Sequence, residues 1–254
     1  MKFNRIIYLL LAIALPLVSF AKSDTQALFE KGNTAYAKAQ YKQALADYQQ
    51  ILNAGYQSAA LYFNMGNASY KDGEFTTAIW YYEKARKLSP GDEDINFNIR
   101  FANLKTTDKV DEPQEFFLTK WWRGFILSAS LNALSITSIL LVLFGSVLLI
   151  IYFFSHLVGL KKASFYIAIV LFVCGVFTIF IAAMQQSYFD SNKQAIIFTG
   201  TVNIKSGPAE QTATLFVLHD GTKVNILDTN NGWIKIKLAN GNQGWLKKVD
   251  VKTI

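Results

Sequence analysis

Two stretches of the chain, residues 132–154 and 163–184, contain no charged side chain and consist mostly of large apolar residues. At about 1.5 Å of rise per residue, a helix over either stretch would cross a hydrocarbon layer about 30 Å thick. The connector between them, residues 155–162, is short, so the two helices would run antiparallel as a transmembrane hairpin. The alternative is a buried helical pair, but the rest of a 254-residue chain is too small to enclose both.

Residues 1–21 have the pattern of a secretory signal peptide. Lys2 and Arg5 precede an apolar run over 6–15, and Ala21 ends a small-x-small sequence suited to cleavage. A short membrane anchor is the alternative, but about ten apolar residues are too few to span a bilayer. The segment that follows is therefore expected outside the cytoplasm, in the periplasm of a bacterium.

A period of 34 residues relates two parts of the N-terminal region. Three small or aromatic residues recur at this spacing: Gly32, Ala44 and Tyr48 return as Gly66, Ala78 and Tyr82. Both segments also carry the apolar spacing of amphipathic helices, and such a period is typical of helix–turn–helix repeat arrays. The predicted boundaries are 22–107 for the whole domain, 25–58 and 59–92 for two repeats, and 93–107 for a capping helix.

These repeats resemble the tetratricopeptide repeat (TPR), most closely over 59–92, which keeps the closing Pro90 of that family. The resemblance implies a groove that binds a segment of a partner protein and is lined by first-helix residues. Carried over to this chain, the protein-binding groove comprises Phe29, Asn33, Tyr36, Phe63, Asn64, Asn67, Tyr70, Phe97 and Asn98. Asparagine amides can pair with a peptide backbone, and aromatic rings supply apolar contact area. The alternative is that these asparagines are ordinary solvated positions on helix surfaces.

Residues 194–254 change to short runs with a period of two, and Asn-Gly and Asp-Gly pairs between them suit tight turns. About five such strands predict a small β-barrel. The sequence VNIKSGP at 202–208 and the Gly-Trp pairs at 232–233 and 244–245 resemble the bacterial SH3 domain. That resemblance implies a ligand among cell-wall peptides or, as the alternative, a spacer role.

Residues 108–131 are expected to form a linker and then a helix lying at the membrane surface. Trp121 and Trp122 stand beside two cationic residues, a combination found at membrane interfaces. The expected location is the bacterial inner membrane, multi-pass, with the helical repeats and the barrel in the periplasm. The connector 155–162 would then lie in the cytoplasm.

The sequence offers little support for catalysis. Cys174 is the single cysteine, and His156 and His219 lack thiol or carboxylate companions at metal-ligand spacing. Neither a phosphate-binding glycine loop nor a nucleophile motif is found, so we expect no enzyme activity, no metal and no cofactor. The net charge of +7 is spread over the membrane flanks and the barrel, which argues against a nucleic-acid partner.

The predicted fold class is multidomain: an α-helical TPR repeat domain, a two-helix transmembrane hairpin and a C-terminal all-β barrel like the bacterial SH3 domain. This order of modules resembles the BatE-like proteins of the Bacteroides aerotolerance (Bat) group. The resemblance implies an operon with a MoxR-type ATPase and von Willebrand A-domain membrane proteins, and a role in envelope stress or oxygen tolerance. Two functions stay open: a scaffold whose TPR groove binds a partner protein, and a cell-wall sensor whose barrel binds peptidoglycan.

Overall fold

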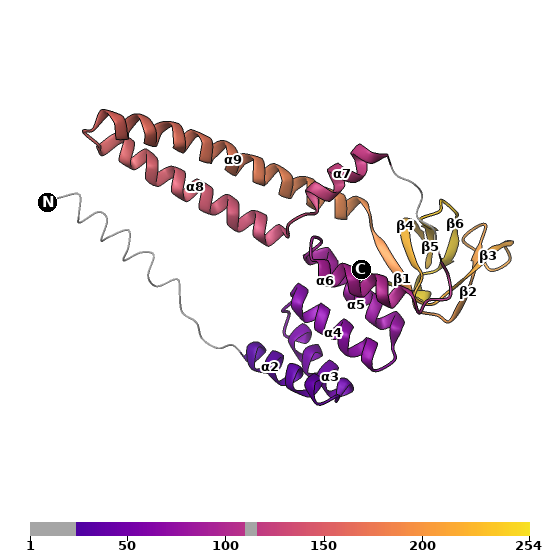
Figure 1. Ribbon diagram of the computed structural model, residues 1–254. Coiled ribbons are helices and arrows are strands. Elements are labelled where there is room, and N and C mark those ends of the chain that lie inside the picture. The colour runs from indigo at the N-terminus through magenta and orange to yellow at the C-terminus, as the bar shows by residue number, and fades with distance from the viewer. Residues whose placement is uncertain (1–23, 110–115) are drawn as a thin grey trace. The chain divides into compact units, whose positions relative to one another are not determined.

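The computed structural model describes residues 24–109 and 116–254. The predicted signal peptide, residues 1–21, and part of the predicted linker lie outside the described residues. Within the described ranges the chain forms helices α2 to α9 followed by strands β1 to β7 (Figure 1). It divides into two compact units, one ending at Tyr56 and one beginning at Gln57.

The first unit contains a helical hairpin of α2 (Asp24–Ala37) and α3 (Tyr41–Asn53). The two helices approach closely at Gly32, where an added Cβ atom would collide with the ring of Tyr48. Tyr48 and Ala44 are both buried, so large and small side chains alternate at this crossing.

The second unit begins with an equivalent hairpin of α4 (Ala59–Lys71) and α5 (Phe75–Leu88). A Cβ atom added at Gly66 would lie 2.5 Å from the ring of Tyr82, and Ala78 is fully buried. The contact of Gly32 with Tyr48 thus recurs 34 residues later, as the sequence period predicts. Helix α6 (Glu93–Asn103) follows, capped by the Asp92 carboxylate, and ends four residues before the predicted limit of 107.

The turn inside each hairpin needs a residue in the left-handed backbone region. In the second hairpin Gly73 fills this place with φ +88°. In the first hairpin the equivalent residue is Ala39, with φ 59°. An alanine there costs about 1–2 kcal/mol relative to a right-handed conformation, so the first turn is the more strained of the two.

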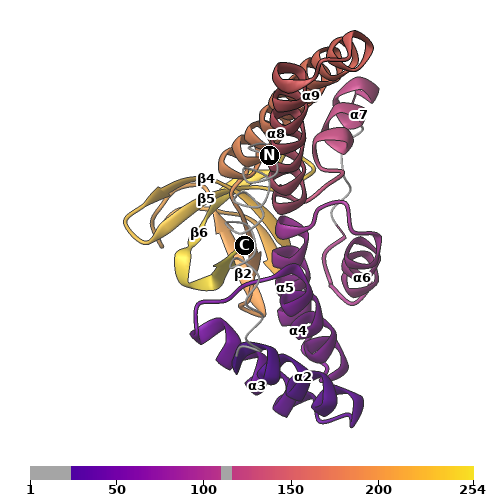
Figure 2. The ribbon, with the colours of Figure 1, turned by 90° about the vertical axis from the view of Figure 1, so that its left-hand side faces the viewer.

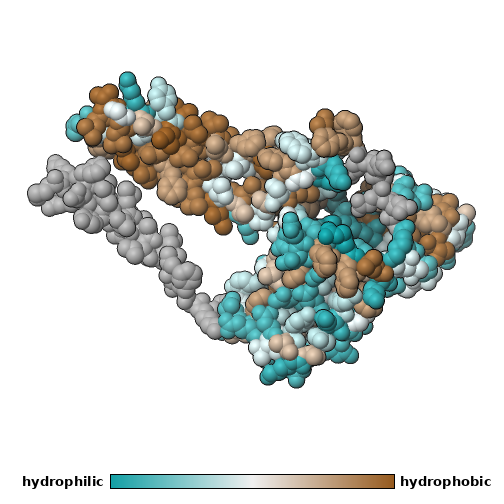
Figure 3. Space-filling model, viewed as in Figure 1, coloured by the Kyte–Doolittle hydropathy of each residue, from teal (hydrophilic) through white to brown (hydrophobic). Residues whose placement is uncertain are grey.

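Helices α8 (Leu131–Phe154) and α9 (Val158–Ser191) run side by side in both views of the ribbon (Figures 1 and 2). By length and composition both could cross a membrane, and apolar residues cover their surface (Figure 3). Helix α9 extends beyond the predicted span 163–184 at both ends, so the connector is shortened to residues 155–157. Leu160, Lys161 and Lys162 in its first turns are good helix formers, and the Lys161 ammonium lies 5.1 Å from the Tyr152 ring centroid.

Helix α7 (Phe117–Ile126) lies in the predicted interfacial segment and exposes Trp121, Trp122 and Phe125, whose rings contact one another. Its C-terminal end is held by Gln185 of α9. The buried Gln185 amide donates to the carbonyls of Ile126 at 3.1 Å and Ala129 at 2.8 Å. The position of α7 in a membrane surface stays a prediction.

The C-terminal region is one antiparallel sheet of seven strands, rather than the five or so expected, in the order β3-β2-β6-β5-β4-β1-β7. The strands are β1 (Gln194–Ile197), β2 (Thr201–Lys205), β3 (Thr214–His219), β4 (Lys223–Asn230), β5 (Trp233–Lys237), β6 (Gln243–Lys247) and β7 (Val251–Thr253). Six of the strands contribute to one buried apolar cluster, so the sheet curls around a single core. The β4–β5 hairpin turns at Asn231 and Gly232, which both have positive φ, as the Asn-Gly signal predicts.

Candidate functional site

Two predicted groove residues of the second unit, Asn67 and Asn98, meet a tyrosine of α5 at one amide. The Asn67 Oδ1 atom accepts a hydrogen bond from the Tyr82 hydroxyl at 2.8 Å and another from Asn98 Nδ2 at 3.0 Å. Asn67 therefore joins α4, α5 and α6, and its orientation is fixed by two donors.

An exposed aromatic surface lies beside this amide. The rings of Phe97 and Phe101 stack with centroids 6.2 Å apart, and Tyr70 lies 5.5 Å from Phe101. Phe97 is 57% exposed and Phe101 is 47% exposed.

The remaining groove residues show the same geometry in both hairpins. The Tyr48 hydroxyl donates to Asn33 Oδ1 at 2.7 Å, as Tyr82 does to Asn67. The other predicted positions, Phe29, Tyr36, Phe63 and Asn64, are half-buried. The ring centroids of Phe29 and Tyr48 are 5.9 Å apart, as are those of Phe63 and Tyr82 in the second hairpin. The Tyr36 ring lies 5.5 Å from that of Tyr41. Binding of a partner at these residues stays a prediction.

A second polar cluster, which the sequence did not reveal, joins α5 to the sheet. Thr76, Trp80, Glu83 and Lys87 are spaced i, i+4, i+7 and i+11, so they share one face of α5. The Trp80 indole N–H donates to the Thr253 carbonyl at 2.8 Å, and the Lys87 ammonium donates to the Ile254 carbonyl at 2.9 Å. We call this contact the α5–sheet junction.

At the centre of the α5–sheet junction lies a buried carboxylate. Glu83 is 3% exposed and forms ion pairs with Lys223 of β4 at 3.1 Å and with Arg86, one turn away, at 2.5 Å. Two cations compensate one buried anion, which satisfies the requirement that a buried charge be paired.

Trp80 adds cation–π contacts to the junction. The Lys84 ammonium lies 4.1 Å from its ring centroid and Lys252 of β7 lies 5.4 Å away. Burial, and then the nearby charges of Lys87 and Lys252, lower the pKa of Lys84. The rings of Trp80 and Phe198 also meet edge to face, with centroids 6.1 Å apart. The Trp80 indole thus contacts side chains of α5 and of the sheet region.

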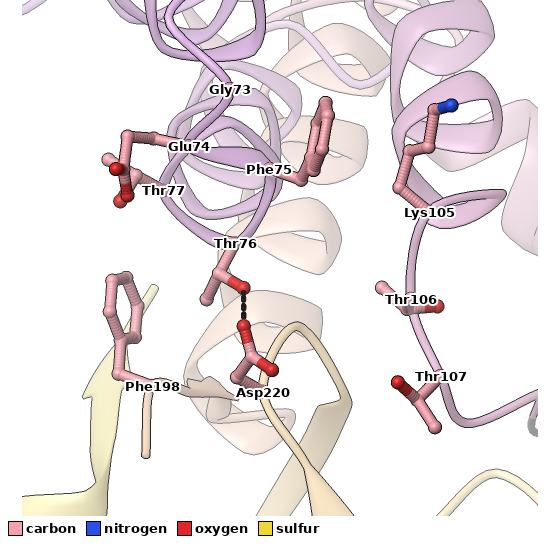
Figure 4. Close-up of a pocket in the computed structure, with 10 residues that line it drawn as sticks. All are labelled: Gly73, Glu74, Phe75, Thr76, Thr77, Lys105, Thr106, Thr107, Phe198 and Asp220. Carbon is pink, nitrogen blue, oxygen red and sulfur yellow. Dashed lines mark hydrogen bonds between the residues drawn. The ribbon is translucent and has the colours of Figure 1, made fainter. Parts of the chain in front are cut away.

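Asp108, after α6, holds the turn between β3 and β4. Its carboxylate accepts the His219 backbone N–H at 2.6 Å, the His219 Nδ1–H at 2.9 Å and the Thr222 hydroxyl at 2.7 Å. Burial alone would raise the pKa of Asp108, but these hydrogen bonds outweigh it and the pKa lies below its ordinary value of 3.8. Beside this turn the Thr76 hydroxyl donates to Asp220 at 2.5 Å (Figure 4).

Residues 200–252 match the family model of the bacterial SH3 domain. The resemblance drawn from the SGP and Gly-Trp elements is therefore confirmed for this part of the chain. From here, residues 194–254 are called the SH3-like domain.

A relative in Bacillus subtilis (strain 168) shares a short stretch with this chain. Over 77 residues the chain is 30% identical to "Putative N-acetylmuramoyl-L-alanine amidase YrvJ". The stretch is 30% of this chain and 15% of that protein, so the chain spans a small part of its length.

Acidification is expected to loosen the contact between Asp108 and the SH3-like domain. Because the pKa of Asp108 is lowered, its ionised form stabilises the folded state above about pH 4, and this contribution is lost as the pH falls through the lowered pKa. Hydrogen exchange at the His219 amide, corrected for intrinsic rates, should quicken at low pH. Asp108→Asn should remove this acid-dependent increase in exchange. The same increase in the variant would show that Asp108 is not its cause.

A polar pocket opens between α5, the segment after α6 and the SH3-like domain (Figure 4). Threonine hydroxyls, two carboxylates and Lys105 line it; its lining includes Glu74, Thr76, Thr106, Thr107, Phe198 and Asp220. Among the described residues no group of three His, Cys, Asp or Glu side chains could hold a metal ion.

One sequence signal could have pointed to the junction. Ala78, Tyr82 and Ala85 already supply the buried face of α5 toward its own hairpin. Trp80 lies on a different face, where a solvated helix would carry a polar residue. A large apolar residue on a second face of a helix indicates that a second element packs there. The neighbouring residues in the sequence do not show which element it is.

Proposed function

We propose that this protein is a membrane-anchored scaffold whose helical repeats, of the TPR type, bind a segment of a partner protein in the groove carried over from that family. The observation that supports this most is the repeated pairing of Asn33 with Tyr48 and of Asn67 with Tyr82. The hydroxyls hold two amides at equivalent places on the first helix of each hairpin. Aromatic residues flank both amides, so each hairpin offers a partner both polar and apolar contacts.

The module order favours a place among the BatE-like proteins of the Bat group. The partner would then be a von Willebrand A-domain membrane protein of the same operon, working with a MoxR-type ATPase in an envelope-stress or aerotolerance complex. The role is one of binding and positioning, without catalysis, metal or cofactor.

The α5–sheet junction supports a hairpin topology, in which the parts before and after the two apolar helices lie on the same side of the membrane. Helix α5 precedes both apolar helices and the SH3-like domain follows them, yet Glu83 and Lys223 form an ion pair. Parts in such contact lie on the same side of a membrane, which requires an even number of crossings between them. Two crossings, by α8 and α9, meet this requirement.

Partner binding can be tested by crosslinking in intact membranes, followed by isolation of this chain. Asn33→Ala with Asn67→Ala is expected to abolish capture of the partner. Because these amides also accept hydrogen bonds inside the hairpins, the matched control is Tyr48→Phe with Tyr82→Phe. That control removes both tyrosine–asparagine hydrogen bonds and leaves in place the two amides and the hydrogen bond from Asn98 to Asn67. If both variants lost capture equally, the loss would be explained by weaker hairpins, and the proposal that the two amides contact the partner would be contradicted.

A second function, cell-wall sensing, is favoured by the family match and by the amidase relative. In this alternative the SH3-like domain binds peptidoglycan and the repeats report the contact. Full-length protein in detergent should then sediment with purified sacculi, and soluble peptidoglycan fragments should compete. Failure to sediment would leave the SH3-like domain as a spacer.

A further inference from the structure

Helix α6 and the residue that follows it carry an apolar stripe that is exposed among the residues that the structure describes. Phe97, Phe101 and Leu104 are spaced i, i+4 and i+7, and Leu104 is 69% exposed. On its other side α6 buries Ile95 and Ile99. The stripe is therefore a second apolar face rather than the edge of the first.

The residue types on α6 show that the stripe does not serve another hairpin. In α4 the face that packs on the second helix consists of Tyr62, Gly66 and Ser69. Thirty-four residues later the same positions are Asn96, Arg100 and Asn103, which are polar and too large for a close crossing. The array of hairpins ends at α6, while the exposed stripe lies at the positions next to this polar face.

The charges on α6 fit a second copy of the same helix. Glu93 and Asp94 lie in its first turn, Arg100 lies in its last turn, and Lys105 follows. Two such helices in antiparallel orientation would place the acidic end of each beside the basic end of the other. Opposite charges at both ends also complement the helix dipoles.

We propose that two copies of this protein associate through an antiparallel pair of α6 helices related by a two-fold axis. Phe97 of one copy packs beside Phe101 of the other, and Leu104 covers the first turn of the partner helix. The pairing is self-complementary, as a two-fold interface requires. The contact is small, but anchoring both copies in one membrane raises their effective concentration.

Cysteine crosslinking tests which residues of the two α6 helices lie beside each other. In full-length protein with Cys174→Ala, chains with Phe97→Cys and chains with Phe101→Cys are co-expressed with different tags and oxidised in membranes. We expect a disulfide-linked product at twice the chain mass that contains both tags and exceeds the product of either chain alone. Leu88→Cys, an exposed apolar position outside the stripe, is the matched control. Equal crosslinking at Leu88, no product, or a product with the mass of another protein would overturn the proposal.

Charge exchange tests the orientation independently of the aromatic residues. Glu93→Lys alone and Lys105→Glu alone should each reduce the crosslinked product, because like charges then face each other across the two-fold axis. The double variant should restore it. A double variant as deficient as the single ones would exclude the antiparallel pairing. Phe97 belongs both to the predicted groove and to this stripe. Capture of a partner protein is therefore tested at Asn33 and Asn67, which lie outside the stripe, so failure of one proposal does not decide the other.

Discussion

Replacing Gly66 with alanine is expected to destabilise the second helical hairpin by about 1–3 kcal/mol, although alanine is the better helix former. The new Cβ atom would lie 2.5 Å from the Tyr82 ring. That ring is 2% exposed, and its hydroxyl is held by Asn67, so it has little room to move. The steric cost therefore exceeds the gain in helix propensity, which is about 1 kcal/mol.

Hydrogen exchange of the α4 and α5 amides in the full-length protein measures this effect, and exchange should quicken in both helices. Gly124→Ala in α7 is the control, because an added Cβ atom there has no neighbour within 4 Å. Combining Gly66→Ala with Tyr82→Leu should lower the cost of the alanine relative to its cost in the native protein. Unchanged exchange in Gly66→Ala would show that the helices do not cross closely at this glycine.

Cysteine labelling across the membrane is expected to give an all-or-none pattern. With Cys174→Ala, cysteines introduced at Asn53 and Asn230 should react with an impermeant maleimide added from the periplasmic side. One introduced at Gly159 should react only after the membrane is permeabilised. All three positions are exposed, so accessibility to the reagent reports the side of the membrane.

Opposite labelling of Asn53 and Asn230 would require an odd number of crossings and would contradict the hairpin. It would also be incompatible with the ion pair between Glu83 and Lys223. Labelling of Gly159 from the periplasmic side would invert the orientation.

The helical hairpins could be anticipated because their determinants are local and repeated. Gly66 and Tyr82 lie 16 positions apart, and the same pair recurs at Gly32 and Tyr48. The backbone conformation of Ala39 could not be predicted from its residue type. Alanine does not favour positive φ, so its left-handed backbone follows from its equivalence to Gly73 alone.

Apart from the second apolar face of α5 marked by Trp80, the α5–sheet junction could not be anticipated, because its pairs lie far apart in sequence and use common surface residues. Asp108 and His219 are separated by 111 positions, and Glu83 and Lys223 by 140. A glutamate or lysine on an amphipathic helix normally indicates a solvated face. Only the folded arrangement shows that these charges face each other.

The length of α9 has a mechanical consequence for the SH3-like domain. After the apolar stretch the helix continues from Gln185 to Ser191, about 10 Å at 1.5 Å per residue, before two further residues lead into β1. A continuous helix resists bending and twisting, and the two-residue link between α9 and β1 allows little independent movement of the strand. In the proposed membrane hairpin, rotation or tilt of α9 would therefore be transmitted as torque to the first strand of the SH3-like domain.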